Sequence, residues 1–203
     1  MLEPTEDELR ILSADEQTRA ARFAFANGRR RFRAAHVELR RLLAARTGQS
    51  PGALEFANGP FGKPALLGGA ACAFNLSDSA DVALVAIAPE GELGVDVEVL
   101  RAVDDGLDLA RRNFTDSECA ELGSVATEAR DRAFLRCWTR KEACLKAIGS
   151  GLSIAPETFE AGLTPLPRVT RIATPSGSVS VEVHSIEAGD DVVAALAWVC
   201  QPR

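Results

Sequence analysis

The most constraining feature of the sequence is a stretch with helical periodicity whose apolar face contains charged residues, FLRCWTRKEACLKAIGSGL at residues 134–152. Its apolar residues recur at three- and four-residue steps, as on one face of a helix: Phe134, Cys137, Trp138, Leu145 and Ile148. Lys141 falls in the middle of this face, with Glu142 beside it. A core helix does not normally carry a lysine there, so Lys141, Glu142 and Lys146 are candidates for a chemical role.

Composition limits the class of protein. The chain has 203 residues, 46% of them hydrophobic, which suffices for one substantial core or two small cores that share an interface. The first residues lack the basic and apolar regions of a signal peptide, and the longest apolar run, residues 82–88, is far shorter than the ~20 residues that span a bilayer. We therefore expect a soluble, cytoplasmic protein with no membrane partner.

Cysteine and histidine usage argues against several kinds of site. The five cysteines show no CxxC spacing, which favours small buried hydrophobic side chains over disulfides or zinc ligands. The only two histidines are His36 and His184, too few for a histidine-rich metal site. The sequence also contains no GxSxG, Walker or GxGxxG motif.

A cationic segment lies within an acidic chain. Nine arginines gather between residues 19 and 46 against Glu38 alone, although the net charge of the chain is -6. Apolar residues keep helical spacing through the segment, so the arginines crown a helix that packs by its other face. They form either a solvated face or an anion site for phosphates or an acidic partner protein. Nucleic acid is disfavoured, because aromatic residues are scarce and tyrosine is absent.

The order of elements predicts an α+β fold. Residues 7–47 should be helical with a break at Asn27–Gly28, and residues 81–88 and 93–100 should form a hairpin across the turn PEGE. Three further helices are expected at residues 107–112, 115–123 and 128–149. An antiparallel meander should follow from Arg168 onward. The stretch DVVAALAW at 191–198 echoes DVALVAIA at 81–88, which gives weak support to a two-fold pseudo-repeat.

The stretch GELGVDVEVL, residues 91–100, predicts a strand with two carboxylates on one face. Asp96 and Glu98 alternate with apolar residues, so their Cα atoms lie roughly 6.6 to 6.8 Å apart. The pattern suits an edge strand with outward acidic residues, and it also suits a divalent cation such as Mg²⁺ completed by phosphates and water. Glu142 offers a third oxygen ligand if its helix crosses this strand. Otherwise Glu142 and Lys146 form an ordinary i,i+4 pair.

Lysine is rare in this chain. There are 20 arginines but only three lysines, and all three lie in segments of interest: Lys63, Lys141 and Lys146. A compact ammonium can approach a phosphate where a guanidinium fork would be too large, which favours lysine at a phosphoryl centre.

Several segments together resemble a known family. In order and spacing, four motifs look like those of the Sfp-type 4′-phosphopantetheinyl transferases: FGKP at 61–64, FNLSDS at 74–79, GVDVE at 94–98 and WTRKEACLKAIGSGL at 138–152. RAARFAFANGRRRF, from Arg19, resembles the family's arginine-containing helical region. The resemblance covers most of residues 13–152.

The resemblance implies two similar α+β halves related by pseudo-two-fold symmetry, with coenzyme A in the cleft between them. We place the halves at residues 1–90 and 91–203, the second carrying the metal site. Mg²⁺ is expected on Asp96, Glu98 and Glu142. Lys146 and Lys141 would act with Glu142 at the reacting phosphates, Glu142 also being the candidate general base. Coenzyme A contacts are expected from five residues: Arg19, Arg31, Lys63, Ser77 and Asp78.

The implied reaction transfers the 4′-phosphopantetheine group of coenzyme A to a serine of an acyl or peptidyl carrier protein, releasing 3′,5′-ADP. The enzyme would act as a monomer in fatty-acid, polyketide or nonribosomal peptide biosynthesis. Asp78 departs from the family pattern, which usually has histidine there, and a carboxylate should repel the 3′-phosphate unless an arginine neutralises it. The alternatives are a non-catalytic homologue that binds coenzyme A or carrier protein, and a metal-dependent phosphohydrolase.

Overall fold

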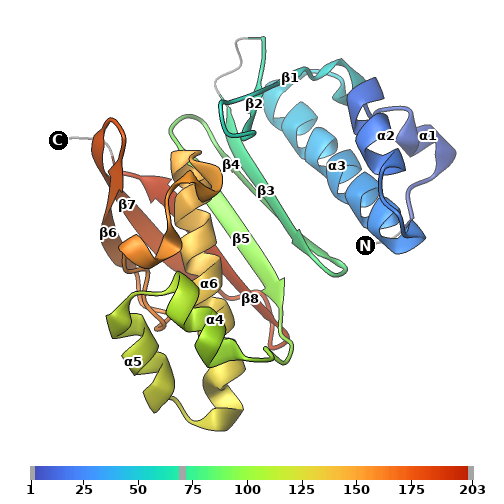
Figure 1. Cartoon of the computed structure of the whole chain (residues 1–203). Coiled ribbons are helices and arrows are strands. Elements are labelled where there is room, and N and C mark those ends of the chain that lie inside the picture. Colours follow the sequence, from blue (N-terminus) through green and yellow to red (C-terminus); the bar gives the residue numbers. More distant parts are fainter. Residues whose placement is uncertain (1–2, 69–71, 201–203) are drawn as a thin grey trace.

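The computed structural model describes residues 3–68 and 72–200 and has an α+β fold, as predicted (Figure 1). In Figure 1 three helices, α1 (Glu6–Leu9), α2 (Ala14–Ala21) and α3 (Ala26–Thr47), flank one side of the strands, and α4 to α6 lie on the side of β5. Within the described ranges no helix has the length and apolarity needed to cross a bilayer.

The break between the N-terminal helices differs from the prediction. Helix α2 ends before Arg22 and α3 begins after Phe25, so that Asn27 and Gly28 lie in the first turn of α3 and do not interrupt a helix. The first N–H groups of a helix have no intrahelical partner, and glycine is tolerated there. Gly28 also admits the Phe23 ring, because a Cβ at residue 28 would lie 2.9 Å from Phe23 Cδ1.

The first strands form two small antiparallel sheets. After the short helix η1 (Pro51–Ala53), β1 (Phe56–Asn58) pairs with β2 (Pro64–Leu66), and β3 (Ala73–Ser79) pairs with β4 (Val82–Ala88). The predicted hairpin between residues 81–88 and 93–100 is therefore wrong. The turn that joins β3 to β4 contains Ala80 with φ 49°, without the glycine or asparagine that normally marks such a turn. The PEGE turn leads instead from one sheet to another.

The C-terminal part contains a four-stranded antiparallel sheet and three helices. The helices follow the prediction closely: α4 (Gly106–Asn113), α5 (Asp116–Ser124) and α6 (Thr127–Ile148). The short turns η2 (Gly151–Ser153) and η3 (Pro156–Thr158) lead into the sheet. Its strands run in the order β5-β8-β7-β6: β5 (Leu93–Val99), β8 (Val192–Val199), β7 (Gly177–Ile186) and β6 (Arg168–Thr174). The predicted meander is confirmed.

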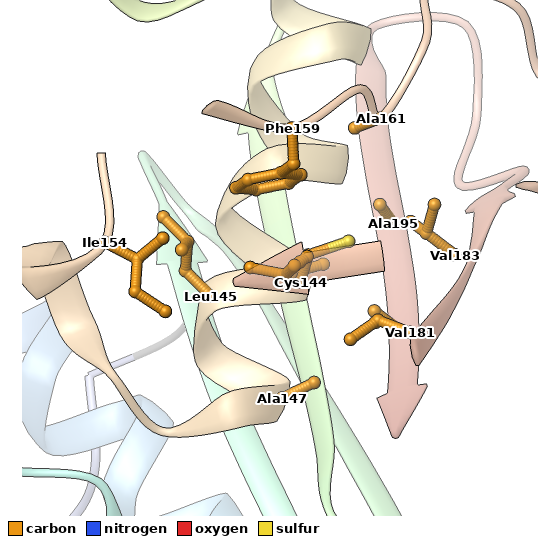
Figure 2. Packing of buried hydrophobic residues seen from close by; sticks show 12 residues of the cluster. Cys144, Leu145, Ala147, Ile154, Phe159, Ala161, Val181, Val183 and Ala195 are labelled. Carbon is orange, nitrogen blue, oxygen red and sulfur yellow. The ribbon is translucent and has the colours of Figure 1, made fainter. Parts of the chain in front are cut away.

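Helix α6 packs its apolar face on this sheet. Figure 2 shows Cys144 of α6 among side chains that include Phe159, Val183 and Ala195, all buried in one cluster. The backbone of α6 lies directly on β5 at Gly94, since a Cβ there would lie 2.3 Å from the carbonyl oxygen of Ala143. This close approach determines which residues of α6 can face β5.

A buried ion pair of the same construction occurs in both parts of the chain. Arg40 of α3 contacts Glu16, and Lys141 of α6 contacts Glu118, each at 2.7 Å. Both glutamates occupy the third position of a capping box, in α2 and α5 respectively. Each cation also donates to the carbonyl oxygen of a proline that begins a short turn. Arg40 donates to Pro51 O, and Lys141 donates to Pro156 O.

The two helices that carry the cations of these ion pairs are also alike. Helices α3 and α6 each have 22 residues and end at a left-handed glycine, Gly48 and Gly149, both with φ 74°. The recurrence favours two similar halves. The pseudo-two-fold relation is not confirmed, because the sheets of the two parts differ. The N-terminal part contains two two-stranded sheets, whereas the C-terminal part contains a single four-stranded sheet. The boundary expected at residue 90 lies between β4 and β5 and stays a prediction.

Candidate functional site

Strands β3 and β5 lie side by side, although they belong to different sheets (Figure 1). Two side chains of β3 accept hydrogen bonds from the backbone of β5: Asn75 Oδ1 from Val95 N at 2.8 Å, and Ser79 Oγ from Val99 N at 3.2 Å. Residue numbers rise together along the two strands, so the strands run parallel. Alternate residues of the FNLSDS motif therefore face β5.

This seam holds both carboxylates of β5. Ser77 Oγ lies 2.8 Å from Asp96 Oδ1, and Ser79 Oγ lies 2.8 Å from Glu98 Oε2. Arg101 also reaches Glu98 Oε2, at 2.9 Å. Asp96 is buried, with 6% of its surface exposed. Although β5 is an edge strand of its sheet, β3 lies beside it, so that Asp96 is buried and Glu98 half-buried instead of pointing outward to solvent.

Helix α6 adds the next two residues. Lys146 Nζ donates to Asp96 Oδ1 at 2.7 Å and to Ser77 Oγ at 3.0 Å, so these three groups form a closed hydrogen-bonded triangle. Glu142, one turn earlier on α6, is half-buried and faces the same space. Helix α6 does cross β5, as the expectation for Glu142 required, and Gly94 is the residue that permits the contact.

The three carboxylates influence one another. Burial raises the pKa of Glu142, and the negative charges of Asp96 and Glu98 raise it further, whereas the Lys146 ammonium acts in the opposite direction. Burial likewise raises the pKa of Asp96, although Lys146 and Ser77 oppose the rise. Of the described residues, none donates a hydrogen bond to Glu142. The cluster is therefore a set of three acidic groups, of which Lys146 pairs with Asp96 and Arg101 with Glu98, while Glu142 has no hydrogen-bonded cation among the described residues.

The chemical type of the donor atoms in the site, carboxylate oxygens, suits a hard divalent cation. Carboxylate oxygens are the protein ligands that Mg²⁺ prefers, and three of them share this space. In residues 3–68 and 72–200, however, no three acidic, imidazole or thiol side chains converge closely enough to hold a metal ion. The Asp96 oxygen that faces the cluster carries the Lys146 ammonium instead.

Lys141 does not belong to this cluster, and the prediction that it faces the cleft is wrong. Its ammonium is fully buried and donates to Pro156 O at 2.8 Å and Phe159 O at 2.5 Å, besides its ion pair with Glu118. Lys141 interrupts the apolar stripe because it holds the segment after α6 against the core. The preceding residue, Arg140, is buried as well, and it donates to Ala161 O at 2.7 Å.

Two expected coenzyme contacts have partners elsewhere in the structure. Lys63 Nζ lies 2.6 Å from Glu92 Oε2 and 3.0 Å from Ala147 O, at the C-terminal end of α6. Arg31 Nε lies 3.2 Å from Asp81 Oδ1, at the turn between β3 and β4. Of the five residues expected to contact coenzyme A, Ser77 is the one whose hydrogen bonds join it to the carboxylate cluster.

Arg19 and Asp78 both lie near a residue that the sequence did not single out, His36. The His36 ring stacks on Phe32 at 3.8 Å between centroids, and the Arg19 guanidinium lies 5.2 Å from the same Phe32 ring. Burial lowers the pKa of His36, Arg19 lowers it too, and the charge of Asp78 raises it. An imidazole therefore does lie near position 78, but it comes from α3 and not from β3.

Sequence reasoning also missed the residues that assemble the cluster. Asn75 and Ser79 lie inside a recognised motif, and their alternation with Ser77 was a usable signal for one face of a strand. Gly94 was a second signal, because an isolated glycine in a strand often marks close backbone approach.

Comparisons with known proteins identify the family of the chain. Residues 92–197 match the family model described as the 4′-phosphopantetheinyl transferase superfamily. The 4′-phosphopantetheinyl transferase HetI of a Nostoc species is 38% identical over 189 residues, which cover 92% of this chain and 78% of the relative. A putative 4′-phosphopantetheinyl transferase of a Synechocystis species is 37% identical over 145 residues, 70% of this chain and 59% of the relative. The transferase AcpT of Salmonella typhimurium is 43% identical over 95 residues, 47% of this chain and 50% of the relative.

Proposed function

Because the chain belongs to the 4′-phosphopantetheinyl transferase superfamily, we propose that it transfers the 4′-phosphopantetheine group of coenzyme A to a serine hydroxyl of an acyl or peptidyl carrier protein, with release of 3′,5′-ADP. The observation that carries the proposal is the cluster of Asp96, Glu98, Glu142 and Lys146. We further propose that the protein is a cytoplasmic monomer.

Asp96, Glu98 and Glu142 would hold Mg²⁺, and a bound Mg²⁺ would stabilise negative charge on the reacting phosphoryl group. Lys146 supports the same task. Its side chain is 29% exposed, so the ammonium could donate to a phosphate oxygen at the edge of the cluster. The two cations would thereby offset the negative charges of the carboxylates and of a pyrophosphate.

Glu142 is the candidate general base. In the reaction the serine oxygen attacks the phosphorus that bears pantetheine, the bond from that phosphorus to 3′,5′-ADP breaks, and the serine proton must leave. Glu142 has a raised pKa and no hydrogen-bond donor among the described residues, so its carboxylate is a better proton acceptor than an ordinary glutamate. It would take the proton directly or through one water.

The nucleotide end of coenzyme A would be held by the cationic residues of the N-terminal part. Arg19, Arg31 and Lys63 stay proposed contacts, and so do Ser77 and Asp78. Arg19 is supported by its surroundings, because it contacts the same Phe32 ring as His36, whose pKa burial lowers and the charge of Asp78 raises.

The test is incubation with coenzyme A, Mg²⁺ and a panel of apo carrier proteins, with the mass of each carrier measured. A mass increase of one phosphopantetheine, accompanied by 3′,5′-ADP, would support the transfer. Coenzyme A binding without 3′,5′-ADP would indicate a non-catalytic homologue. Phosphopantetheine released in the absence of any carrier protein would indicate a phosphohydrolase.

A further inference from the structure

The Lys146 ammonium lies beside Asp96, where a metal ion bound by that carboxylate would be expected. We propose that Lys146 is a place-holder for the divalent cation: in the coenzyme-free protein its ammonium neutralises Asp96, and it leaves Asp96 when a cation binds. The inference rests on the proposed function in one respect only, namely that these carboxylates bind a divalent cation.

The geometry makes the two cations compete for Asp96 Oδ1. Lys146 Nζ is 2.7 Å from Asp96 Oδ1 and 3.0 Å from Ser77 Oγ, which is itself 2.8 Å from the same Oδ1. Mg²⁺ bound to the same oxygen would lie roughly 2.0 to 2.1 Å from it, and Mg²⁺ tolerates little departure from octahedral geometry. An ammonium and Mg²⁺ on one oxygen would be close enough to repel strongly.

Burial explains why the metal-free protein needs such a group. Asp96 is 6% exposed, and an ionised carboxylate at that depth is costly unless it is paired. Glu98 has Ser79 and Arg101, but Glu142 has no donor among the described residues. Lys146 therefore supplies the positive charge that lets the acidic cluster fold before a metal is bound.

Lys146 is also able to move, which a purely structural lysine is not. Its side chain is 29% exposed and it lies two residues from the end of α6. Lys141, five residues earlier, is fully buried and bound to Glu118, Pro156 and Phe159. One helix thus carries a fixed lysine and a lysine that can change partners.

A place-holder couples metal binding to coenzyme binding. The apparent metal affinity is the intrinsic affinity multiplied by the fraction of molecules in which the ammonium has left Asp96, so a small fraction means weak binding. A phosphate group that offers Lys146 another partner should raise that fraction and hence the metal affinity. The metal-free protein would then bind Mg²⁺ weakly until coenzyme A arrives.

The experiment compares Mg²⁺ binding to the coenzyme-free protein by calorimetry in wild type, Lys146→Met and Arg168→Met. Arg168 pairs with Glu160 on the surface, so the control removes one positive charge without touching Asp96. We expect Lys146→Met to bind Mg²⁺ at least tenfold more tightly than wild type, and Arg168→Met within about twofold of it. Unchanged or weaker binding by Lys146→Met, or no binding by any of the proteins, would overturn the place-holder.

A second measurement needs no substitution at Lys146. The chain has only three lysines, so their ammonium signals can be resolved by NMR of the ¹⁵N-labelled protein. Saturating Mg²⁺ should shift or broaden the Lys146 signal and leave that of Lys141 unchanged. A Lys146 signal that does not respond while Mg²⁺ binds would refute the proposal.

The two hypotheses fail separately. If wild type transfers no phosphopantetheine but Lys146→Met gains Mg²⁺ affinity, the proposed function fails and the place-holder stands. If transfer occurs and the Mg²⁺ affinity of Lys146→Met does not rise, the place-holder alone fails. Ser77→Ala, which removes one side of the triangle, should raise Mg²⁺ affinity a few-fold and serves if Lys146→Met does not fold.

Discussion

Gly94 of β5 lies against Ala143 of α6 so closely that a Cβ at residue 94 would come within 2.3 Å of the Ala143 carbonyl oxygen. The same imaginary atom would lie 2.3 Å from Ala147 N. Both obstacles are backbone atoms of one helix, which cannot rotate away as a side chain can. The contact brings Glu142 and Lys146 to Asp96.

Gly94→Ala should therefore displace α6 from β5. Overpacking of a well-packed core typically costs about 1 to 3 kcal/mol, and backbone contacts place this substitution at the upper end. We expect a lower melting temperature and a large loss of transfer activity in the molecules that remain folded. Gly123→Ala is the matched control, because among the described residues no atom outside its own stretch of α5 lies within 4 Å of its Cβ position, and it should be neutral or slightly stabilising. Equal stability of the two variants would show that α6 is free to shift.

Lys141→Met should destabilise the fold and not the chemistry. The substitution leaves the buried Glu118 carboxylate without its cation, and breaking a buried pair in this way costs about 3 to 5 kcal/mol. Urea unfolding should show the loss, and the double variant with Glu118→Gln should recover part of it. Activity per folded molecule should be retained. A selective loss of transfer at full stability would return Lys141 to the reacting centre.

Glu142→Gln should reduce transfer by roughly 10²-fold or more, since it removes a candidate base and an expected metal ligand together. The same change should stabilise the metal-free protein. The folded-state pKa of Glu142 lies above its ordinary value of 4.5, so the folded protein holds this proton more tightly than the unfolded chain does. The stability of the wild type therefore falls as pH rises through the window between 4.5 and the folded-state pKa. Unfolding at several pH values should show the gain above that window and little difference below it. Wild-type transfer by the variant would remove Glu142 from the mechanism.

Asp96→Ala should change the metal requirement of transfer. Raising Mg²⁺ should restore activity only in part, because water cannot fully replace a carboxylate in a small hard-cation site. Glu160→Ala removes a surface carboxylate paired with Arg168 and should keep the wild-type Mg²⁺ dependence. Identical Mg²⁺ titrations for the two variants would exclude Asp96 as a ligand.

Asp78→His should lower the KM for coenzyme A, because it removes a negative charge from the expected site of the 3′-phosphate. Arg31 forms its ion pair with Asp81, which leaves the charge of Asp78 to be felt by His36. The gain should be smaller with dephospho-coenzyme A, which lacks that phosphate. A gain of equal size with both substrates would mean that Asp78 does not sense the 3′-phosphate.

Local patterns in the sequence were enough for the elements and the family. The helices of residues 106–148, the glycine end of α6 and the closing meander follow from periodicity and caps, which depend on neighbours in the chain. The motifs that carry Ser77, Asp96, Glu142 and Lys146 led to the superfamily that the comparisons confirm.

Which residues meet across the fold was decided by tertiary packing. Lys141 and Lys146 lie five positions apart on one helix, yet one is fully buried against Glu118 and the other reaches Asp96. Helical periodicity gives the direction of a side chain but not what lies opposite it. The β3–β4 pairing was missed for a different reason, because the turn at Ala80 contains no glycine or asparagine and the PEGE turn gave the clearer hairpin signal. The carboxylate cluster exists because Gly94 lets two distant segments touch, and such a contact is a property of the folded chain.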